Sequence, residues 1–134
     1  MTFEPVNYLA VLVAGLAQML LGIVWYSKAF FGKSWQQANA VTDEQIKATA
    51  GPAMTTDLIG ALVIAYGIAR LMSAMHVAGT WWGCFLALLI AITIVAPIML
   101  SGVLHTAKLM KLFWIDYSYR FVSLLLAGLI VGLW

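Results

Sequence analysis

The sequence predicts an all-α membrane protein, a bundle of four transmembrane helices in a single domain over residues 1–134. Of its 134 residues, 64% are hydrophobic and 9% are charged, and the mean hydropathy is +1.00. So few polar side chains cannot cover the outside of a water-facing globule of this size. Four apolar runs have about the length that crosses roughly 30 Å of hydrocarbon at about 1.5 Å per residue. The expected spans are about 7–26, 53–75, 80–104 and 114–134.

The first span carries a stripe of polar and small side chains. One helix face holds, at steps of three or four residues, Asn7, Val11, Gly15, Gln18 and Gly22. Small residues let helices approach closely, and buried amides can hydrogen-bond across a bundle. We therefore expect this stripe to pack against other helices, with a pore-lining role for the two amides as the alternative. Because the N-terminus lacks Lys and Arg and the apolar run is long, we interpret the segment as a retained span.

Aromatic and basic side chains mark the end of this span. The stretch from Trp25 to Trp35 contains five aromatic residues and two lysines, a mixture typical of the boundary between hydrocarbon and cytoplasmic headgroups. We expect interfacial anchoring from Trp25, Tyr26, Lys33 and Trp35. Three tryptophans should have the same role in the later spans: Trp81, Trp82 and Trp114.

The only sizeable polar segment follows, and we expect residues 27–52 to connect the first two spans at the cytoplasmic surface. Thr42 with Gln45 three residues later matches a capping box. This pattern predicts a short helix through Ala50, which Gly51-Pro52 then stops.

The second span combines charged residues with a small-residue seam. Asp57 lies in its first turns, where a carboxylate suits the positive end of the helix dipole. Arg70 lies near the far end of the span. Ala61 and Ala65 are four residues apart and predict a tightly packed face.

The third span contains Pro97, which removes one backbone hydrogen bond and predicts a kink. Thr93, Ser101 and His105 lie at four-residue steps from this proline. They predict a polar line that runs toward the cytoplasmic surface.

The fourth span has two unlike halves, and residues 105–113 form the connection before it. Asp116 and Arg120 are four residues apart with the acid first, the favourable order for an ion pair on one helix face. Gly128 and Gly132 form a Gly-x-x-x-Gly pair, which favours close helix packing.

The distribution of lysines predicts the orientation of the chain. The first and third connections carry all five: Lys28, Lys33, Lys47, Lys108 and Lys111. The positive-inside rule therefore puts both connections in the cytoplasm and both termini outside. We expect a multi-pass protein of the inner (plasma) membrane.

Several of these residues also carry a family resemblance. They are Asn7 to Val11, Trp25-Tyr26-Ser27, Phe31-Gly32-Lys33 with Trp35, Lys111-Leu112-Phe113 and Ile115-Asp116. In these the chain resembles the bacterial membrane family known as domain of unknown function 1761, over essentially its whole length. Members of that family often have proline after the serine, where this chain has Lys28. The resemblance implies a four-span protein of about this size, and it implies no activity or catalytic residue.

Little in the sequence points to catalysis or to a cofactor. His76 and His105 are expected at opposite membrane faces and Cys84 near neither, so no metal site is expected. Glycine-rich nucleotide loops and a Gly-x-Ser-x-Gly elbow are absent from the sequence, and we expect no enzyme. A net charge of +2 without a basic cluster excludes nucleic acid as a partner.

One group of polar residues is a candidate binding site on the cytoplasmic side. Its members are Arg120, Asp116, Asp57, His105 and Ser101. An ionisable side chain within the membrane usually faces a bundle interior or water. The group is either a set of interfacial anchors that pair at helix ends, or a site for a substrate, lipid headgroup or proton in which Arg120 binds an anion.

Two functions are compatible with these features. The first is a transport or permeation protein made competent by homo-oligomerisation, because small-residue faces exceed what one bundle needs. The alternative is a non-catalytic scaffold that binds membrane lipid or another membrane protein through the same faces.

Overall fold

The computed structural model describes residues 4–134, and within them all regular structure is helical. The helices are, in chain order, α1 (Tyr8–Trp25), α2 (Gly32–Asn39), α3 (Asp43–Ala74), α4 (Thr80–Ile90), the π-helix η1 (Ala91–Val95), α5 (Ala96–His105) and α6 (Met110–Leu133). Four segments are long and apolar enough to cross a membrane: Tyr8–Trp25, Asp43–Ala74, Thr80–His105 and Met110–Leu133. The all-α class and the four candidate spans expected from the sequence are confirmed.

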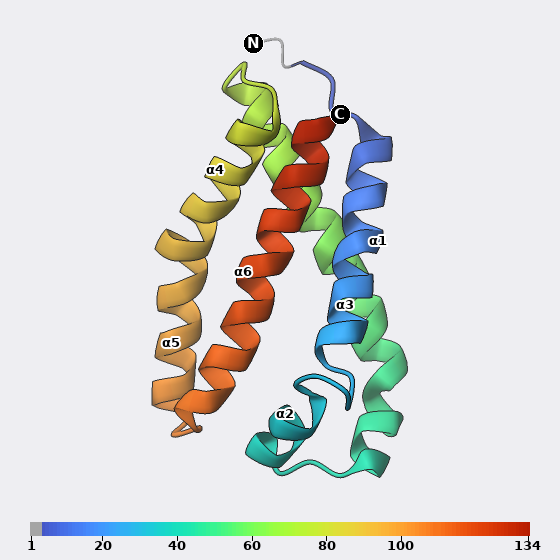
Figure 1. The fold of residues 1–134 in the computed structure, drawn as a ribbon, viewed down its shortest axis with the longest axis vertical. Helices are drawn as coiled ribbons and strands as arrows, with labels where there is room; N and C mark the ends of the chain where they lie inside the picture. Colours follow the sequence, from blue (N-terminus) through green and yellow to red (C-terminus); the bar gives the residue numbers. More distant parts are fainter. Residues whose placement is uncertain (1–3) are drawn as a thin grey trace.

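The four spans form two antiparallel helix pairs that meet along α6. α1 packs on α3, α4 packs on α6, and α6 also contacts α1 and α3. Figure 1 shows α1 and the first part of α3 on one side of α6, α4 and α5 on the other, and the second part of α3 crossing behind α6 toward α4. The start of α1 and the end of α6 lie at the same end of the bundle. At the opposite end, which we call the lysine end, lie α2, the start of α3, the α5–α6 turn and the start of α6, and these segments with the turn before α2 hold the five lysines of the sequence: Lys28, Lys33, Lys47, Lys108 and Lys111.

Small residues make the closest contacts between the helices. Five alanines are fully buried: Ala14, Ala65, Ala87, Ala91 and Ala127. A side chain added at Gly83 would overlap the backbone of Gly128, and one added at Gly128 would overlap Gly83. α4 and α6 therefore approach until their backbones touch, as small residues permit in a membrane. Gly132 likewise meets the backbone of Gly79, so the Gly128 and Gly132 seam packs within the chain's own bundle.

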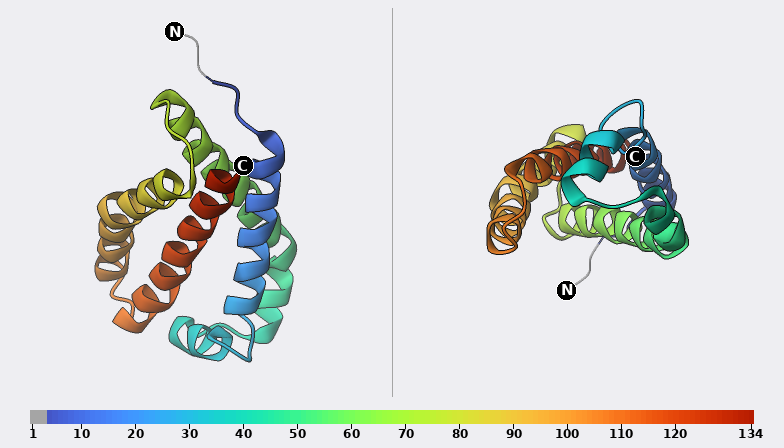
Figure 2. Two further views of the ribbon diagram at one scale, coloured as in Figure 1. Left: turned by 45° about the horizontal axis from the view of Figure 1, so that its top comes forward. Right: turned by 90° about the horizontal axis from the view of Figure 1, so that it is seen from below.

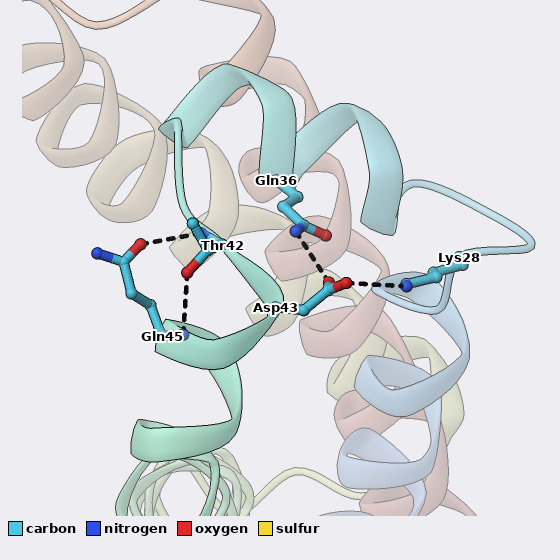
Figure 3. A network of polar contacts seen from close by, with 5 residues as sticks. All are labelled: Lys28, Gln36, Thr42, Asp43 and Gln45. Carbon is cyan, nitrogen blue, oxygen red and sulfur yellow. Dashed lines mark hydrogen bonds and ion pairs between the residues drawn. The ribbon is translucent and has the colours of Figure 1, made fainter.

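α3 is longer than the expected second span, and Pro52 lies inside it. The predicted capping box is confirmed: Gln45 N–H donates to Thr42 Oγ1 at 3.2 Å, and Thr42 N–H donates to Gln45 Oε1 at 2.9 Å (Figure 3). The expectation that Gly51-Pro52 ends a separate short helix is wrong. A proline leaves the carbonyl four residues earlier unbonded, and this part of α3 is exposed, where water can bond a carbonyl. The 32 residues of α3 extend about 48 Å, so its first turns reach beyond roughly 30 Å of hydrocarbon.

Asp43, the first residue of α3, contacts two residues of the connection that precedes this helix. Its carboxylate lies 3.6 Å from the Lys28 ammonium and accepts a hydrogen bond from the Gln36 amide at 3.0 Å (Figure 3). The three residues come from the turn between α1 and α2, from α2 and from the start of α3. All are at least partly exposed, so each contact stabilises the fold only weakly.

The third span is irregular next to Pro97, as the sequence predicts. The π-helix η1 ends two residues before this proline, and Figure 2 shows the helix axis bending between α4 and α5. Ala91 O accepts the π-helical hydrogen bond from the Ala96 N–H. It also accepts a hydrogen bond from Tyr117 Oη at 3.1 Å, which joins the bend to α6.

Candidate functional site

A buried amide joins three helices at the centre of the bundle. Gln18 is 1% exposed, and its Nε2 donates to Ala14 O at 3.2 Å and to Ala61 O at 3.1 Å. Its Oε1 accepts a hydrogen bond from Ser123 Oγ at 3.0 Å, and the backbone carbonyl of Gln18 accepts one from Tyr119 Oη at 3.3 Å. α1, α3 and α6 are thus joined by hydrogen bonds, and both N–H donors of the amide are used within the bundle.

The other predicted packing residues of α1 and α3 lie close to this amide. A side chain added at Gly15 would overlap Leu62 of α3, and one at Gly22 would lie 2.9 Å from the Tyr119 hydroxyl. Ala61 and Ala65 are buried on the α1-facing side of α3. Asn7 differs from the expectation: it is exposed, and its Oδ1 accepts from Leu9 N–H at 3.0 Å and Ala10 N–H at 3.2 Å. It caps α1 because the first N–H groups of a helix lack partners.

The aromatic stretch after α1 is bonded to the start of α6. Tyr26 Oη donates to Asp116 Oδ1 at 2.7 Å, and Trp25 Nε1 donates to Ile115 O at 3.2 Å. The Tyr26 ring also lies edge-on to the rings of Trp35 and Tyr119, at 6.0 and 5.3 Å between centroids. The anchors expected from the sequence therefore include a side chain that orients Asp116.

The expected ion pair between Asp116 and Arg120 does not form. Among the described residues, no carboxylate lies within 4.0 Å of the Arg120 guanidinium. The spacing of four residues allows the pair, but Asp116 accepts a hydrogen bond from Tyr26, which is 90 residues away in the sequence. A rule based on spacing within one helix cannot predict such a partner. Arg120 Cζ instead lies 5.2 Å from the centroid of the Tyr119 ring, a cation–π distance.

Arg120 borders a pocket of about 230 Å³ between α3, the α4–η1 junction and α6. The pocket is lined by Ile64, Gly67, Ile68, Leu71, Ile90, Val95, Arg120, Ser123 and Leu124. Only Arg120 and Ser123 are polar, and the Ser123 hydroxyl is already bonded to Gln18. Arg120 lies ten residues, or about 15 Å, along α6 from Met110. The pocket therefore combines an aliphatic wall with one unneutralised cation inside a candidate membrane span.

The bundle is loosely packed on the lysine-end side of this pocket. α5 contains no buried residue, and α3 contains none before Ala61. Seen from the lysine end, α5 and the first turns of α3 lie well apart (Figure 2). The Arg120 side chain is exposed, so the pocket can be reached from the surrounding bilayer.

The remaining predicted site residues are not all grouped around Arg120. Asp57 is exposed on α3, and within the described residues no ion pair joins its carboxylate to Arg120. Ser101 and His105 are exposed on α5 and bond each other, with 3.3 Å between Ser101 Oγ and His105 Nδ1. Among the residues that the structure describes, their side-chain polar contacts lie within α5, so these two residues lie outside the site.

The sequence indicated Arg120 but not the groups that surround it. Tyr119 and Ser123 are four residues apart in α6 and bond Gln18. This spacing was a signal that could have placed them on one face. No sequence pattern indicated Gly67 as a site residue, because its place in the pocket follows from the open space beside it in the folded chain.

The interfacial residues outside this region lie on the surface of the bundle. Trp81 and Trp114 are 75% and 60% exposed, and Lys33 is exposed. Trp82 is half-buried and lies edge-on to Phe85 at 5.8 Å. Within residues 4–134, no three side chains of the His, Cys, Asp or Glu types converge as metal ligands would.

The fold and these surfaces define a helical protein with four candidate membrane spans. A family model described as "Protein of unknown function (DUF1761)" matches residues 9–132. The chain therefore belongs to this family, which confirms the resemblance seen in the sequence. No curated protein and no solved structure matches the chain.

Proposed function

We propose that this chain is a non-catalytic membrane protein that binds an anionic phospholipid, with the lipid phosphate on Arg120. The observation that carries the proposal is the Arg120 guanidinium beside an aliphatic pocket, with no described carboxylate within ion-pair distance. Arginine recognises phosphate through two parallel hydrogen bonds, which makes it well suited to this ligand.

The electrostatics support an anionic ligand. A charged side chain deep in the membrane is disfavoured by about 2.5–3.5 kcal/mol on insertion scales. The contact with the Tyr119 ring offsets about 0.5–2 kcal/mol of this cost. A phosphate supplies the missing counter-charge, and the long arginine side chain can extend toward the headgroup region to meet it.

Native mass spectrometry of the protein purified from a bilayer that contains phosphatidylglycerol tests this function. We expect one tightly retained anionic lipid per chain in the wild type, and its loss in Arg120→Gln. Arg70→Gln is the matched control, because it removes the chain's other arginine and should keep the lipid. Equal retention by the wild type and Arg120→Gln would refute the proposal.

The second candidate is transport or permeation by a homo-oligomer. The faces that suggested self-association, which include Gln18, Ala61 and Gly128, are buried within one chain. A different face supports this candidate: Gly60 and Gly67 are seven residues apart on α3, and a side chain added at either would meet nothing within 4 Å. Mass measurement in lipid nanodiscs tests it, because a monomer at all protein-to-lipid ratios would exclude an oligomeric path.

We also propose that the protein resides in the inner (plasma) membrane of a bacterium, with the lysine end in the cytoplasm. All five lysines of the chain are at that end, which agrees with the positive-inside rule. The cytoplasmic leaflet would then supply the anionic lipid for Arg120.

A further inference from the structure

We infer that one acyl chain of the lipid bound at Arg120 enters the aliphatic pocket against Gly67. This inference rests on the proposed function and names the class of ligand, an anionic lipid recognised by both its headgroup and one tail.

The pocket lies on the correct side of Arg120 for a lipid tail. Arg120 is the lining residue of α6 nearest to the lysine end, and Ser123 and Leu124 lie farther along α6, beyond its midpoint. On α3, the lining runs from Ile64 to Leu71, which is about 10 Å along the helix. A lipid with its phosphate at Arg120 therefore has its tail directed into the pocket.

Gly67 keeps the pocket open at its α3 wall. A Cβ added to Gly67 would meet no heavy atom within 4 Å, so the space beside it is unfilled by the protein. On the opposite wall, Ile90 directly precedes the π-helix η1 and Val95 is its last residue. Single-turn π-helices often occur at functional sites, and here one forms part of the pocket's border.

A lipid tail fits this space better than a helix of a second protein does. Arg120 is the one charged residue in an otherwise almost wholly aliphatic lining, and a lipid offers a phosphate for the cation and a hydrocarbon chain for the wall, whereas an apolar helix face would leave the cation unpaired. A water molecule would need two or more polar partners, but the Ser123 hydroxyl is already bonded to Gln18. A flexible hydrocarbon chain supplies the van der Waals contacts that the empty wall lacks.

Substitution of Gly67 tests the inference separately from the proposed function. The probe is phosphatidylglycerol with either long (oleoyl) or short (hexanoyl) chains, and retention is measured by native mass spectrometry. We expect Gly67→Leu to lower retention of the long-chain lipid at least fivefold and to leave the short-chain lipid unchanged. Gly60→Leu is the matched control, because its added side chain also meets nothing within 4 Å and lies outside the pocket.

Each outcome decides one of the two claims. If Arg120→Gln loses both lipids while Gly67→Leu retains the long-chain lipid like the wild type, the tail assignment is overturned and the proposed function stands. If Arg120→Gln retains both lipids, the proposed function fails. If Gly67→Leu changes the subunit count and not lipid retention, a second copy occupies this face, and the tail assignment is overturned.

A photoactivatable lipid gives a test on the unmodified protein, which does not depend on the folding of a variant. Phosphatidylglycerol with a diazirine in one acyl chain should label residues 64–71 of α3 and the α4–η1 junction in preference to other helices. Equal labelling of every lipid-exposed helix would overturn the inference.

Discussion

Replacement of Gln18 by leucine should destabilise the bundle by about 1–3 kcal/mol. The substitution removes two hydrogen bonds between helices, from Gln18 Nε2 to Ala61 O and from Ser123 Oγ to Gln18 Oε1. Hydrogen bonds between membrane helices contribute about 0.6 kcal/mol on average and about 1.7 kcal/mol at most. The Ser123 hydroxyl also loses its acceptor in a buried position, which adds to the cost.

The free energy of unfolding can be measured by denaturant titration in mixed micelles. The control is Gln37→Leu, because Gln37 is an exposed amide of α2 and its loss should change stability by less than about 0.5 kcal/mol. Adding Ser123→Ala to Gln18→Leu should recover part of the loss, since both buried partners are then apolar. Gln18→Leu as stable as the wild type, or a double variant with simply additive losses, would refute this reasoning.

Three further predictions concern other parts of the fold. Tyr26→Phe removes the 2.7 Å hydrogen bond to Asp116 and should lower the free energy of unfolding by about 1.5–3 kcal/mol, the range for bonds to charged groups; an unchanged denaturation midpoint would contradict it. Gly128→Val overlaps the backbone of Gly83 and should cost about 3 kcal/mol or more by overpacking, whereas Gly102→Val, with nothing within 4 Å, should change stability little in the same titration. A reporter active only outside the cytoplasm should be active when fused after the last residue and inactive when fused between α5 and α6, and the reverse pattern would invert the proposed orientation.

The sequence predicted most of the fold, because membrane spans depend on local composition. A run of apolar residues must form a helix in hydrocarbon, so each span could be located from its own residues. The capping box at Thr42 is also local and was predicted correctly. The prediction that Pro52 ends a helix was wrong. The rule that proline stops a helix does not consider exposure, and in α3 the turn around Pro52 is exposed, so water can bond the carbonyl that the proline leaves without a partner.

The site was predicted less completely, because its contacts join residues far apart in the chain. Arg120 was a candidate on the cost of its charge alone, which does not depend on its neighbours. The absence of an ion pair between Arg120 and Asp116 could not be predicted, since Asp116 accepts a hydrogen bond from Tyr26, the residue that follows α1. The pocket beside it depends on the spread of α3 from α5 and on the π-helix before Pro97, features that follow from packing and not from periodicity.

The headgroup preference of Arg120 tests the central claim most directly. The measurement is the ratio of phosphatidylglycerol to phosphatidylcholine bound to the protein in an equimolar bilayer, for the wild type and for Arg120→Gln. We expect the wild type to enrich the anionic lipid about tenfold, equivalent to about 1.4 kcal/mol, and Arg120→Gln to bind both lipids near the bulk ratio. The same enrichment in both proteins would contradict the assignment of Arg120 as the lipid-binding group.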